Sequence, residues 1–275
     1  MKKLLLSLIL VFSLVSLSWG GVAFDNVDDY IDSNYTPSYS ATDDFSICGW
    51  ASLDNAASGE EYIAAYISHS VQPDGLVQFG VSNGASCVGN DGLHLLVYIR
   101  DDNGNLSTPA EGLCSDTTIT VNTPFSVCLT YDDSEADGIL YMNGVQVAID
   151  TTVDAIGVKN GAFPREFFIG ARNNEGTPNS FWDGNVYEIA FWDNVALSAA
   201  EVALYHNART RRMPCQIQPA TLVKYMPLDD VPDGTSADGD SFSVPCGSDI
   251  TAGTGVDGVN NTGLTSVAER NLSYP

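Results

Sequence analysis

The residues of this sequence that could do chemistry are mainly carboxylates, and three of them lie close together near the N-terminus. Asp25, Asp28 and Asp29 fall between the apolar segment Val22–Phe24 and Tyr30. Aspartates at this spacing can cap a turn by accepting backbone hydrogen bonds, or they can offer the oxygen ligands that Ca²⁺ prefers. Turn capping is the commoner use, and the sequence leaves both uses open.

Aromatic and imidazole side chains give weaker signals. Phe181 and Trp182 come just before an apolar segment and are the best candidates for stacking on a sugar ring, unless they close an edge of the fold instead. The histidines, His69, His94 and His206, are scattered and form no His-x-x-x-His pair. The sequence also contains no glycine-rich phosphate loop and no nucleophile elbow, so these motifs do not indicate an enzyme.

The elements that must position these residues are β-strands. Phe45–Trp50 and Phe125–Thr130 both alternate apolar and small polar residues, and each places a cysteine three positions after a phenylalanine. Alternation with a period of two predicts a half-buried strand, with Ile47 on one face and Cys48 on the other. If the two strands are neighbours, Cys48 and Cys128 lie within reach of a disulfide.

Met1–Gly20 has the features of a secretory signal peptide. Lys2 and Lys3 form the charged start, Leu4–Leu17 the apolar stretch, and Ser18–Gly20 the cleavage pattern. We expect cleavage after Gly20 and a protein that is secreted, extracellular or at the cell surface, with no membrane span after signal removal. Losing the two lysines takes the formal charge from −24 to −26, which makes nucleic acid and anionic membranes poor partners.

Six cysteines in an exported chain favour three disulfides over a metal site, and no Cys-x-x-Cys pair is present. Connectivity cannot be fixed from the sequence alone. Two cysteines bracket a loop-rich segment and two bracket the region after the predicted helix. The expected pairs are therefore Cys48–Cys128, Cys87–Cys114 and Cys215–Cys246.

Short apolar segments separated by Gly, Asn and Asp continue along the chain and predict an antiparallel β-sandwich. Asn143-Gly144 between two such segments is the strongest hairpin signal. Besides the two cysteine strands, strands are expected within 22–31, 62–67, 76–81, 93–99, 139–142, 145–149, 167–170, 185–192 and 220–226. Residues 171–184 are predicted to be a loop.

One helix is predicted. Ser198 is the expected N-cap, Glu201 its capping-box partner and Leu197 a staple onto Val202, and the helix should run to about Ala208. The chain then divides into a signal peptide (1–20), one β-domain (21–212) and a C-terminal segment (213–275) that contains a returning strand and a tail rich in Gly, Thr and Asp.

Four features in order resemble the laminin G-like, concanavalin A-like jelly-roll superfamily, specifically its pentraxin-like branch. They are the opening Phe24–Ile31, the paired Phe-Ser-x-Cys strands, the hairpin Leu140–Gly144, and Gly184–Asp193 leading into the predicted helix. The resemblance implies an all-β jelly-roll sandwich with one short helix and a C-terminal extension. Pentraxins also join their two Phe-x-x-Cys strands by a disulfide, which supports the Cys48–Cys128 pair.

The resemblance further implies a calcium site built from two loops. Asp74, followed by Gly75, matches the first loop of the pentraxin site, and the second loop reads Arg172–Glu175. Because Arg172 places a positive charge where the family has a carboxylate, one calcium ion is expected at most, and ordinary polar loop chemistry is the alternative. The metal ligands implied are Asp74, Asn173, Asn174 and Glu175.

Some jelly-roll relatives are glycoside hydrolases, which need two carboxylates that are often supplied by a Glu-x-Asp-x-x-Glu run. The sequence has no such run; the nearest fragment, Glu135–Asp137, lacks the second glutamate. Glu188 alternates with Tyr187 and Ile189 in a predicted strand and is expected to be a surface or supporting residue. We therefore expect no enzyme activity.

Two functions remain open. The first is a recognition or adhesion module that binds a glycan or another cell-surface molecule, with calcium as its one candidate cofactor. The second is a structural subunit that assembles with copies of itself into an extracellular filament or coat, with residues 250–275 leaving their own domain. In a eukaryotic secretory route, four Asn-x-Ser/Thr sequons would also be glycan acceptors, although the short lysine-led signal looks more prokaryotic. They are Asn34, Asn105, Asn260 and Asn271.

Overall fold

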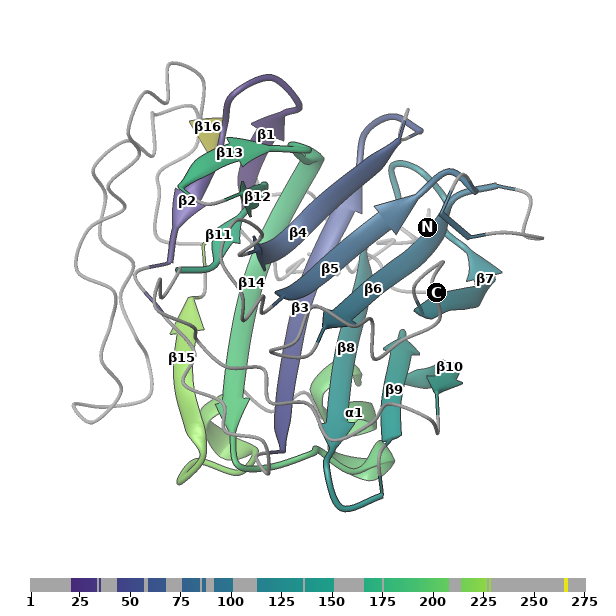
Figure 1. Ribbon diagram of the computed structural model, residues 1–275, viewed down its shortest axis with the longest axis vertical. Coiled ribbons are helices and arrows are strands. Elements are labelled where there is room, and N and C mark those ends of the chain that lie inside the picture. The colour runs from purple at the N-terminus through teal and green to yellow at the C-terminus, as the bar shows by residue number, and fades with distance from the viewer. Residues whose placement is uncertain are drawn as a thin grey trace, which may run out of the picture.

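The protein is a sandwich of two β-sheets packed face to face, as the computed structural model shows (Figure 1). The structure describes residues 21–33, 35, 44–56, 59–67, 76–84, 86–87, 92–100, 113–135, 137–150, 166–174, 176–207, 214–226, 228 and 265–266. The predicted all-β sandwich with one short helix is confirmed. Within the described part of the chain, no helix is both long and apolar enough to span a membrane.

The first sheet has the strand order β10-β9-β8-β3-β14-β1-β16. Strand β15 pairs with β14 on the same edge as β1, because β3 occupies the other edge of β14 along almost its whole length. The strands are β1 (Val22–Asp25), β3 (Phe45–Leu53), β8 (Phe125–Asp132), β9 (Asp137–Met142), β10 (Val145–Asp150), β14 (Asp183–Asp193), β15 (Leu222–Met226) and β16 (Thr265–Ser266).

The second sheet has the order β13-β12-β4-β5-β6-β7, and β11 pairs with both β4 and β2. Strand β12 runs parallel to β4, and the other pairings of the described strands are antiparallel. The strands are β2 (Ile31–Asp32), β4 (Glu60–Ile67), β5 (Leu76–Ser82), β6 (His94–Arg100), β7 (Leu113–Thr118), β11 (Phe168–Ile169), β12 (Arg172–Asn174) and β13 (Thr177–Asn179).

The predicted alternation of β3 and β8 sets the two faces of the first sheet. Phe45 and Ile47 lie in the core between the sheets, whereas Cys48 and Trp50 lie on the outer face. Cys48 is directly opposite Cys128 in the register, and the two form a disulfide with an S–S distance of 2.07 Å. This pairing is therefore confirmed.

The other predicted disulfides divide between described and undescribed residues. Cys87–Cys114 is formed, which confirms the second pair. Cys215 is disulfide-bonded, and its predicted partner Cys246 lies outside the described residues.

Helix α1 (Ala199–His206) covers the outer face of the first sheet. Its predicted capping box is present, since the Glu201 N–H donates to Ser198 Oγ and the Ser198 N–H donates to Glu201 Oε2. The helix ends at His206, two residues earlier than expected, because Asn207 leaves the helical conformation while its N–H still donates to the carbonyl of Ala203. Beneath the helix lies a buried outer cluster that includes Trp50, Tyr141, Tyr187, Trp192, Leu197, Val202, Tyr205 and Tyr225.

Three strands of the second sheet were not predicted from the sequence. Residues 171–184, predicted to be a loop, include β12 and β13, and β7 lies in a segment where no strand was expected. These strands are short and polar, and β13 includes Pro178, so they carry no apolar alternation that a pattern could detect.

The returning strand is confirmed as β15, and Thr265–Ser266 of the tail pairs with β1 of its own domain. Several predictions lie outside the described residues. They concern the signal peptide (1–20) and the sequons at Asn34, Asn105, Asn260 and Asn271.

Candidate functional site

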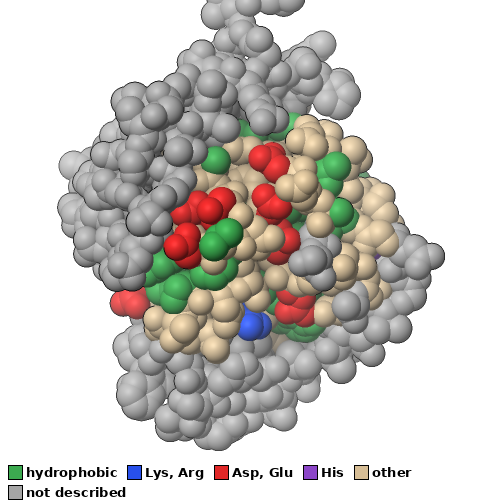
Figure 2. All heavy atoms as spheres, turned by 90° about the horizontal axis from the view of Figure 1, so that it is seen from above, with side chains coloured by type: hydrophobic (Ala, Val, Ile, Leu, Met, Phe, Trp, Pro, Cys, Tyr) green, Lys and Arg blue, Asp and Glu red, His purple; other side chains and the backbone are tan. Residues whose placement is uncertain are grey.

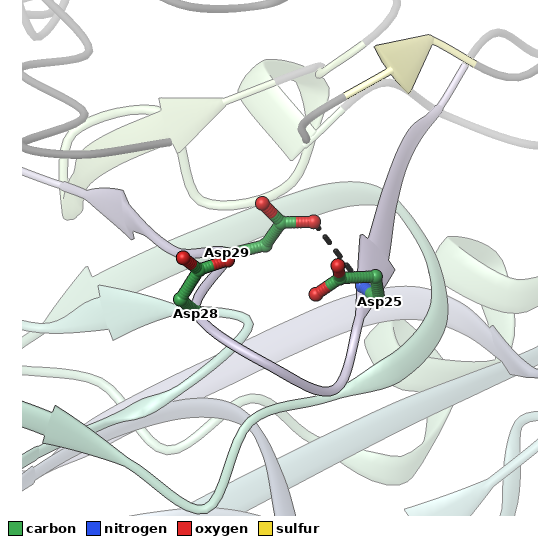
Figure 3. Close-up of side chains that lie close together, drawn as sticks. All are labelled: Asp25, Asp28 and Asp29. Atoms are coloured by element: carbon green, nitrogen blue, oxygen red, sulfur yellow. Dashed lines mark hydrogen bonds between the residues drawn. The ribbon is translucent and has the colours of Figure 1, made fainter. Parts of the chain in front are cut away.

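The turn between β1 and β2 gathers the three aspartates that the sequence placed together (Figure 3). The Val27 N–H donates to Asp25 Oδ1 over 2.9 Å, and the Asp25 N–H donates to Asp29 Oδ2 over 3.2 Å. Asp25 and Asp29 therefore cap the turn. Each of the three residues also offers one carboxylate oxygen, and these oxygens lie within 4.8 Å of one another.

Asp29 differs from its two neighbours because it is fully buried, whereas Asp25 and Asp28 are exposed. Its Oδ1 has no hydrogen-bond partner. Burial, together with repulsion from Asp25 and Asp28, raises the pKa of Asp29 to about 7. A buried carboxylate is stabilised by a cation, and an all-oxygen set of carboxylates fits a hard divalent ion, so the turn could hold a metal.

The segment before β14 lies along this turn. The Asn26 N–H donates to the carbonyl of Trp182 over 3.0 Å, and Asp25 pairs with Asp183 in the sheet. Asn26 adopts a positive φ of 62°, which asparagine tolerates better than most residues and which lets the chain reverse direction here. The acidic turn and the residues before β14 therefore form one surface.

Aromatic side chains border the acidic turn. The rings of Tyr30 and Phe168 lie 4.5 Å apart, and the half-buried Phe181 packs against their cluster. Val27 at the tip of the turn is 66% exposed. Figure 2, which looks down on this end of the sandwich, shows acidic side chains beside hydrophobic ones.

The predicted stacking pair separates into two different environments. Trp182 is fully buried in the core, and its Nε1–H donates to the carbonyl of Ser52 over 3.1 Å. The prediction that Trp182 stacks on a sugar is therefore wrong, because the ring closes the sandwich from inside. Phe181 stays at the surface and remains a candidate.

The described residues do not assemble the calcium site implied by the pentraxin resemblance. Asn173 is buried, and its side chain serves its own turn: Nδ2 donates to the carbonyl of Glu166 over 2.8 Å, and Oδ1 accepts from the N–H of Gly176 over 2.7 Å. The prediction that Asn173 is a metal ligand is therefore wrong, because its side chain stabilises the turn instead. Asn174 is half-buried in β12, and Asp74 and Glu175 lie outside the described residues.

The candidate acids for catalysis are not arranged as a pair. Glu188 is buried on the outer face of the first sheet and accepts a hydrogen bond from the Tyr225 hydroxyl over 3.1 Å. Of the two positions expected for Glu188, its burial excludes the surface and leaves that of a supporting residue, since a bulge in β14 between Val186 and Glu188 places it beside Tyr225 of β15. Glu135 is exposed in the turn between β8 and β9.

Comparisons with known proteins agree with this architecture. The family model of laminin G type described as "Concanavalin A-like lectin/glucanases superfamily" matches residues 25–203. No curated protein matches the sequence.

Three solved structures share the fold. A candidate carbohydrate-binding protein of Bacteroides ovatus is 16% identical with a TM-score of 0.57, and the match covers 91% of this chain and 58% of that one. The sialidase CBM40 module of Ruminococcus gnavus is 12% identical with a TM-score of 0.52, and the match covers 70% of this chain and 99% of that one. A heptameric SAP-like pentraxin of Limulus polyphemus is 12% identical with a TM-score of 0.51, and the match covers 71% of this chain and 85% of that one.

At these identities the structures establish the fold, whereas the family model establishes the family. The family model and the shared fold confirm the laminin G-like, concanavalin A-like resemblance stated from the sequence, and its pentraxin-like branch stays a prediction. Because the family model spans more than half of the 275 residues, this chain belongs to the laminin G-like family of the concanavalin A-like lectin/glucanase superfamily.

Proposed function

We propose that this protein is an exported, non-catalytic module that recognises a glycan at the end of the sandwich formed by the β1–β2 turn, with a calcium ion supporting the site. The family and the carbohydrate-binding relatives support glycan recognition. The observation that carries the site is the buried Asp29 carboxylate, whose Oδ1 has no partner, within a turn of three carboxylates.

The residues of this end have distinct tasks. Asp29 would hold the ion through its buried carboxylate, and the exposed Asp25 and Asp28 would add carboxylate oxygens. Calcium bound here would supply positive charge and coordination positions that sugar hydroxyl oxygens can fill. Phe181 offers part of an aromatic surface on which a sugar ring can pack.

Two further observations support an exported binding module. The two disulfides between described cysteines suit an oxidising compartment outside the cytosol. Glycosidic bond cleavage commonly needs two carboxylates facing one bond, whereas Glu188 is buried beneath other elements.

The alternative, assembly through the tail, expects that residues 250–275 leave their own domain. Thr265–Ser266 instead pair with β1 of the same chain. This pairing favours recognition over a tail that links neighbouring subunits. Light scattering of the native protein tests the alternative, since ordered polymers that persist in chelator would support it.

The experiment that tests the proposal is a glycan array probed with the native protein in calcium and in chelator. We expect retention of glycans that weakens in chelator, and a calcium affinity lowered about tenfold or more by Asp29→Asn. Asp116→Asn, which removes an exposed carboxylate from β7, is the matched control. Glycan binding that is unchanged in chelator would overturn the role of calcium, and no binding under either condition would overturn glycan recognition.

A further inference from the structure

The outer face of the second sheet carries a polar surface that no metal is needed to organise. Gln78 and Tyr98 point outward, because the residues on either side of each belong to the core between the sheets. Gly80 lies beside them, and the space that its side chain would take is occupied by β4. A Cβ at this position would lie 2.9 Å from Cδ1 of Tyr62 and 2.0 Å from the carbonyl oxygen of Glu61. The ring of Tyr62 therefore lies against the backbone of β5.

Glu60 is the centre of this surface. Its carboxylate accepts hydrogen bonds from the hydroxyls of Tyr62, Ser86 and Tyr98, the last over 3.2 Å. The donors come from β4, from β6 and from the segment that follows β5. Glu60, Ser86 and Tyr98 are all half-buried, so this hydroxyl-binding carboxylate is accessible from solvent.

Gln78 supplies a buried amide that the protein does not satisfy. Its side chain is 3% exposed, its Oε1 lies 3.2 Å from the Tyr62 hydroxyl, and its Nε2 has no partner. Burial and the charge of Glu60 raise the pKa of Tyr62 far above its usual range, so the hydroxyl keeps its single proton and donates it in a hydrogen bond to the carboxylate.

Because its proton is used toward Glu60, the Tyr62 hydroxyl can only accept a hydrogen bond from Gln78. Accepting one would require the amide of Gln78 to be flipped, with its NH₂ group toward Tyr62. In the flipped orientation, Oε1 instead of Nε2 is the amide atom that has no partner. Either orientation leaves one polar atom of a nearly fully buried amide for an outside group, which is the independent sign of a ligand.

Arg172 borders the same surface. Its guanidinium lies 5.8 Å from the centre of the Tyr62 ring, and its Nε–H donates to Asn179 Oδ1 over 2.7 Å. This geometry fixes the guanidinium and leaves its two terminal nitrogens as further donors. The surface thus combines a carboxylate acceptor, an amide and a guanidinium around the buried ring of Tyr62.

We infer that this surface, made of Glu60, Tyr62, Gln78, Tyr98 and Arg172, is a binding subsite for one neutral sugar unit; the inference rests on the proposed glycan recognition. Neighbouring sugar hydroxyls donate and accept, so they can bridge the carboxylate and the free atom of the amide. An anionic sugar would be repelled by Glu60 and by a chain of formal charge −24.

The subsite and the acidic turn belong to the same end of the molecule. The carbonyl of Ser180 accepts from the Tyr62 N–H over 3.3 Å, and the carbonyl of Trp182, two residues on, accepts from the Asn26 N–H over 3.0 Å. One short segment therefore borders both surfaces. A glycan of several units that binds at the turn could place another unit on the second sheet.

The test compares Glu60→Gln and Gln78→Met, which keep side-chain size but remove the charge or the amide. Glu135→Gln is the matched control, because it removes an exposed glutamate from the turn at the opposite end of the first sheet. An array of neutral and sialylated oligosaccharides selects the best neutral probe, and calorimetry in excess calcium measures its Kd. We expect both variants to weaken binding about tenfold or more, with calcium affinity and the control unchanged.

The outcomes separate the subsite from the proposed function. Neutral glycan binding that is equal in the native protein and both variants overturns the subsite and leaves glycan recognition standing. Binding of sialylated glycans alone overturns the neutral class, and no glycan binding at all overturns the proposed function together with the subsite. If Gln78→Met is too unstable to measure, Tyr98→Phe replaces it and should weaken binding severalfold.

Discussion

The outer faces of the two sheets are built from the same strand alternation and yet are used differently. On the first sheet, helix α1 covers the outer face (Figure 1). The outward positions beneath it are mostly large and apolar, and Trp50, Trp192 and Tyr205 are fully buried there. On the second sheet the outward positions near Gly80 include polar side chains beside the buried Leu96, and Glu60 and Tyr98 are partly open to solvent.

The difference shows how one sandwich can separate stability from recognition. The first sheet has apolar contacts on both faces, so it acts as the rigid support of the fold. The outer face of the second sheet is mixed: Tyr62 and Leu96 are buried there, whereas the half-buried Glu60 and Tyr98 leave polar groups for hydrogen bonds to an outside molecule. Mutations on the two faces should therefore differ in kind, and the following tests run from the largest expected effect to the smallest.

Removing a large ring from the covered face should cost the most. Trp192 is fully buried, donates from Nε1 to the carbonyl of Ile217 over 2.8 Å and meets Tyr205 edge-on. We expect Trp192→Ala to lower the free energy of unfolding by about 3–5 kcal/mol in urea denaturation followed by circular dichroism. Val27→Ala at an exposed position is the control, and a loss no larger than this control's would show that the outer cluster is not a second core.

The disulfide on the covered face should contribute more to the free energy of unfolding than the disulfide beside the polar face. Cys48–Cys128 joins residues 80 positions apart on the covered face, whereas Cys87–Cys114 joins residues 27 apart beside the polar face. Replacing the first pair by alanines should lower the free energy of unfolding by about 2–4 kcal/mol, and replacing the second pair by less, because the shorter loop constrains the unfolded chain less. Urea midpoints of the two double variants compare them directly, and a reversed order would contradict this account.

The β1–β2 turn connects the two sheets, and its stability should depend on pH. The pKa of Asp29 is raised to about 7 in the folded protein, against about 4 in an unfolded chain. The folded state therefore binds an extra proton between these values, so in chelator this residue makes the protein less stable as the pH rises from about 4 to 7.

Thermal unfolding of the native protein and of Asp29→Asn across this range measures the effect as the difference between the two. Asp116→Asn, which removes an exposed carboxylate of β7 away from the turn, is the control. Calcium should raise the Tm more at pH 8 than at pH 5, because protons compete for Asp29. Identical pH profiles for the native protein and Asp29→Asn would show that the buried carboxylate is not the group that titrates.

The smallest effect should come from the open polar face. Tyr98→Phe removes one hydroxyl from the half-buried carboxylate of Glu60, and we expect it to lower the free energy of unfolding by about 0.5–1.5 kcal/mol in the same urea assay. Tyr98→Leu serves as the comparison that also removes the ring. A loss for Tyr98→Phe as large as that for Trp192→Ala would mean that the polar face is structural rather than a surface for ligands.

Local sequence patterns were enough to predict the covered face. The alternation of Phe45–Trp50 sorted residues correctly between the two faces, and the Ser198–Glu201 spacing located the helix that covers one of them. These features depend on residues that are neighbours in sequence, or on strands whose cysteines mark the pairing.

The candidate sites depend on contacts that no local pattern encodes. Glu60 meets Ser86 and Tyr98 only because β4, β5 and β6 lie side by side in the sheet. The aspartates of the turn could be found from the sequence, but the burial of Asp29 is set by distant segments that pack around the turn. The prediction that Trp182 stacks on a sugar failed for the same reason, since its position before a strand does not show that the ring points into the core.

The edge that β1 and β15 share on β14 also makes this protein suited to circular permutation. Both strands run antiparallel to β14, with Met226 opposite Ile189 and Val22 opposite Val186, so the end of β15 approaches the start of β1. A short linker from Leu228 to Gly21, in place of residues 229–275 with β16 and Cys246, would fuse them into one continuous strand. New termini opened at the Asn143–Gly144 hairpin would then present the molecule from the opposite side of the first sheet, with the acidic turn and the second sheet left intact.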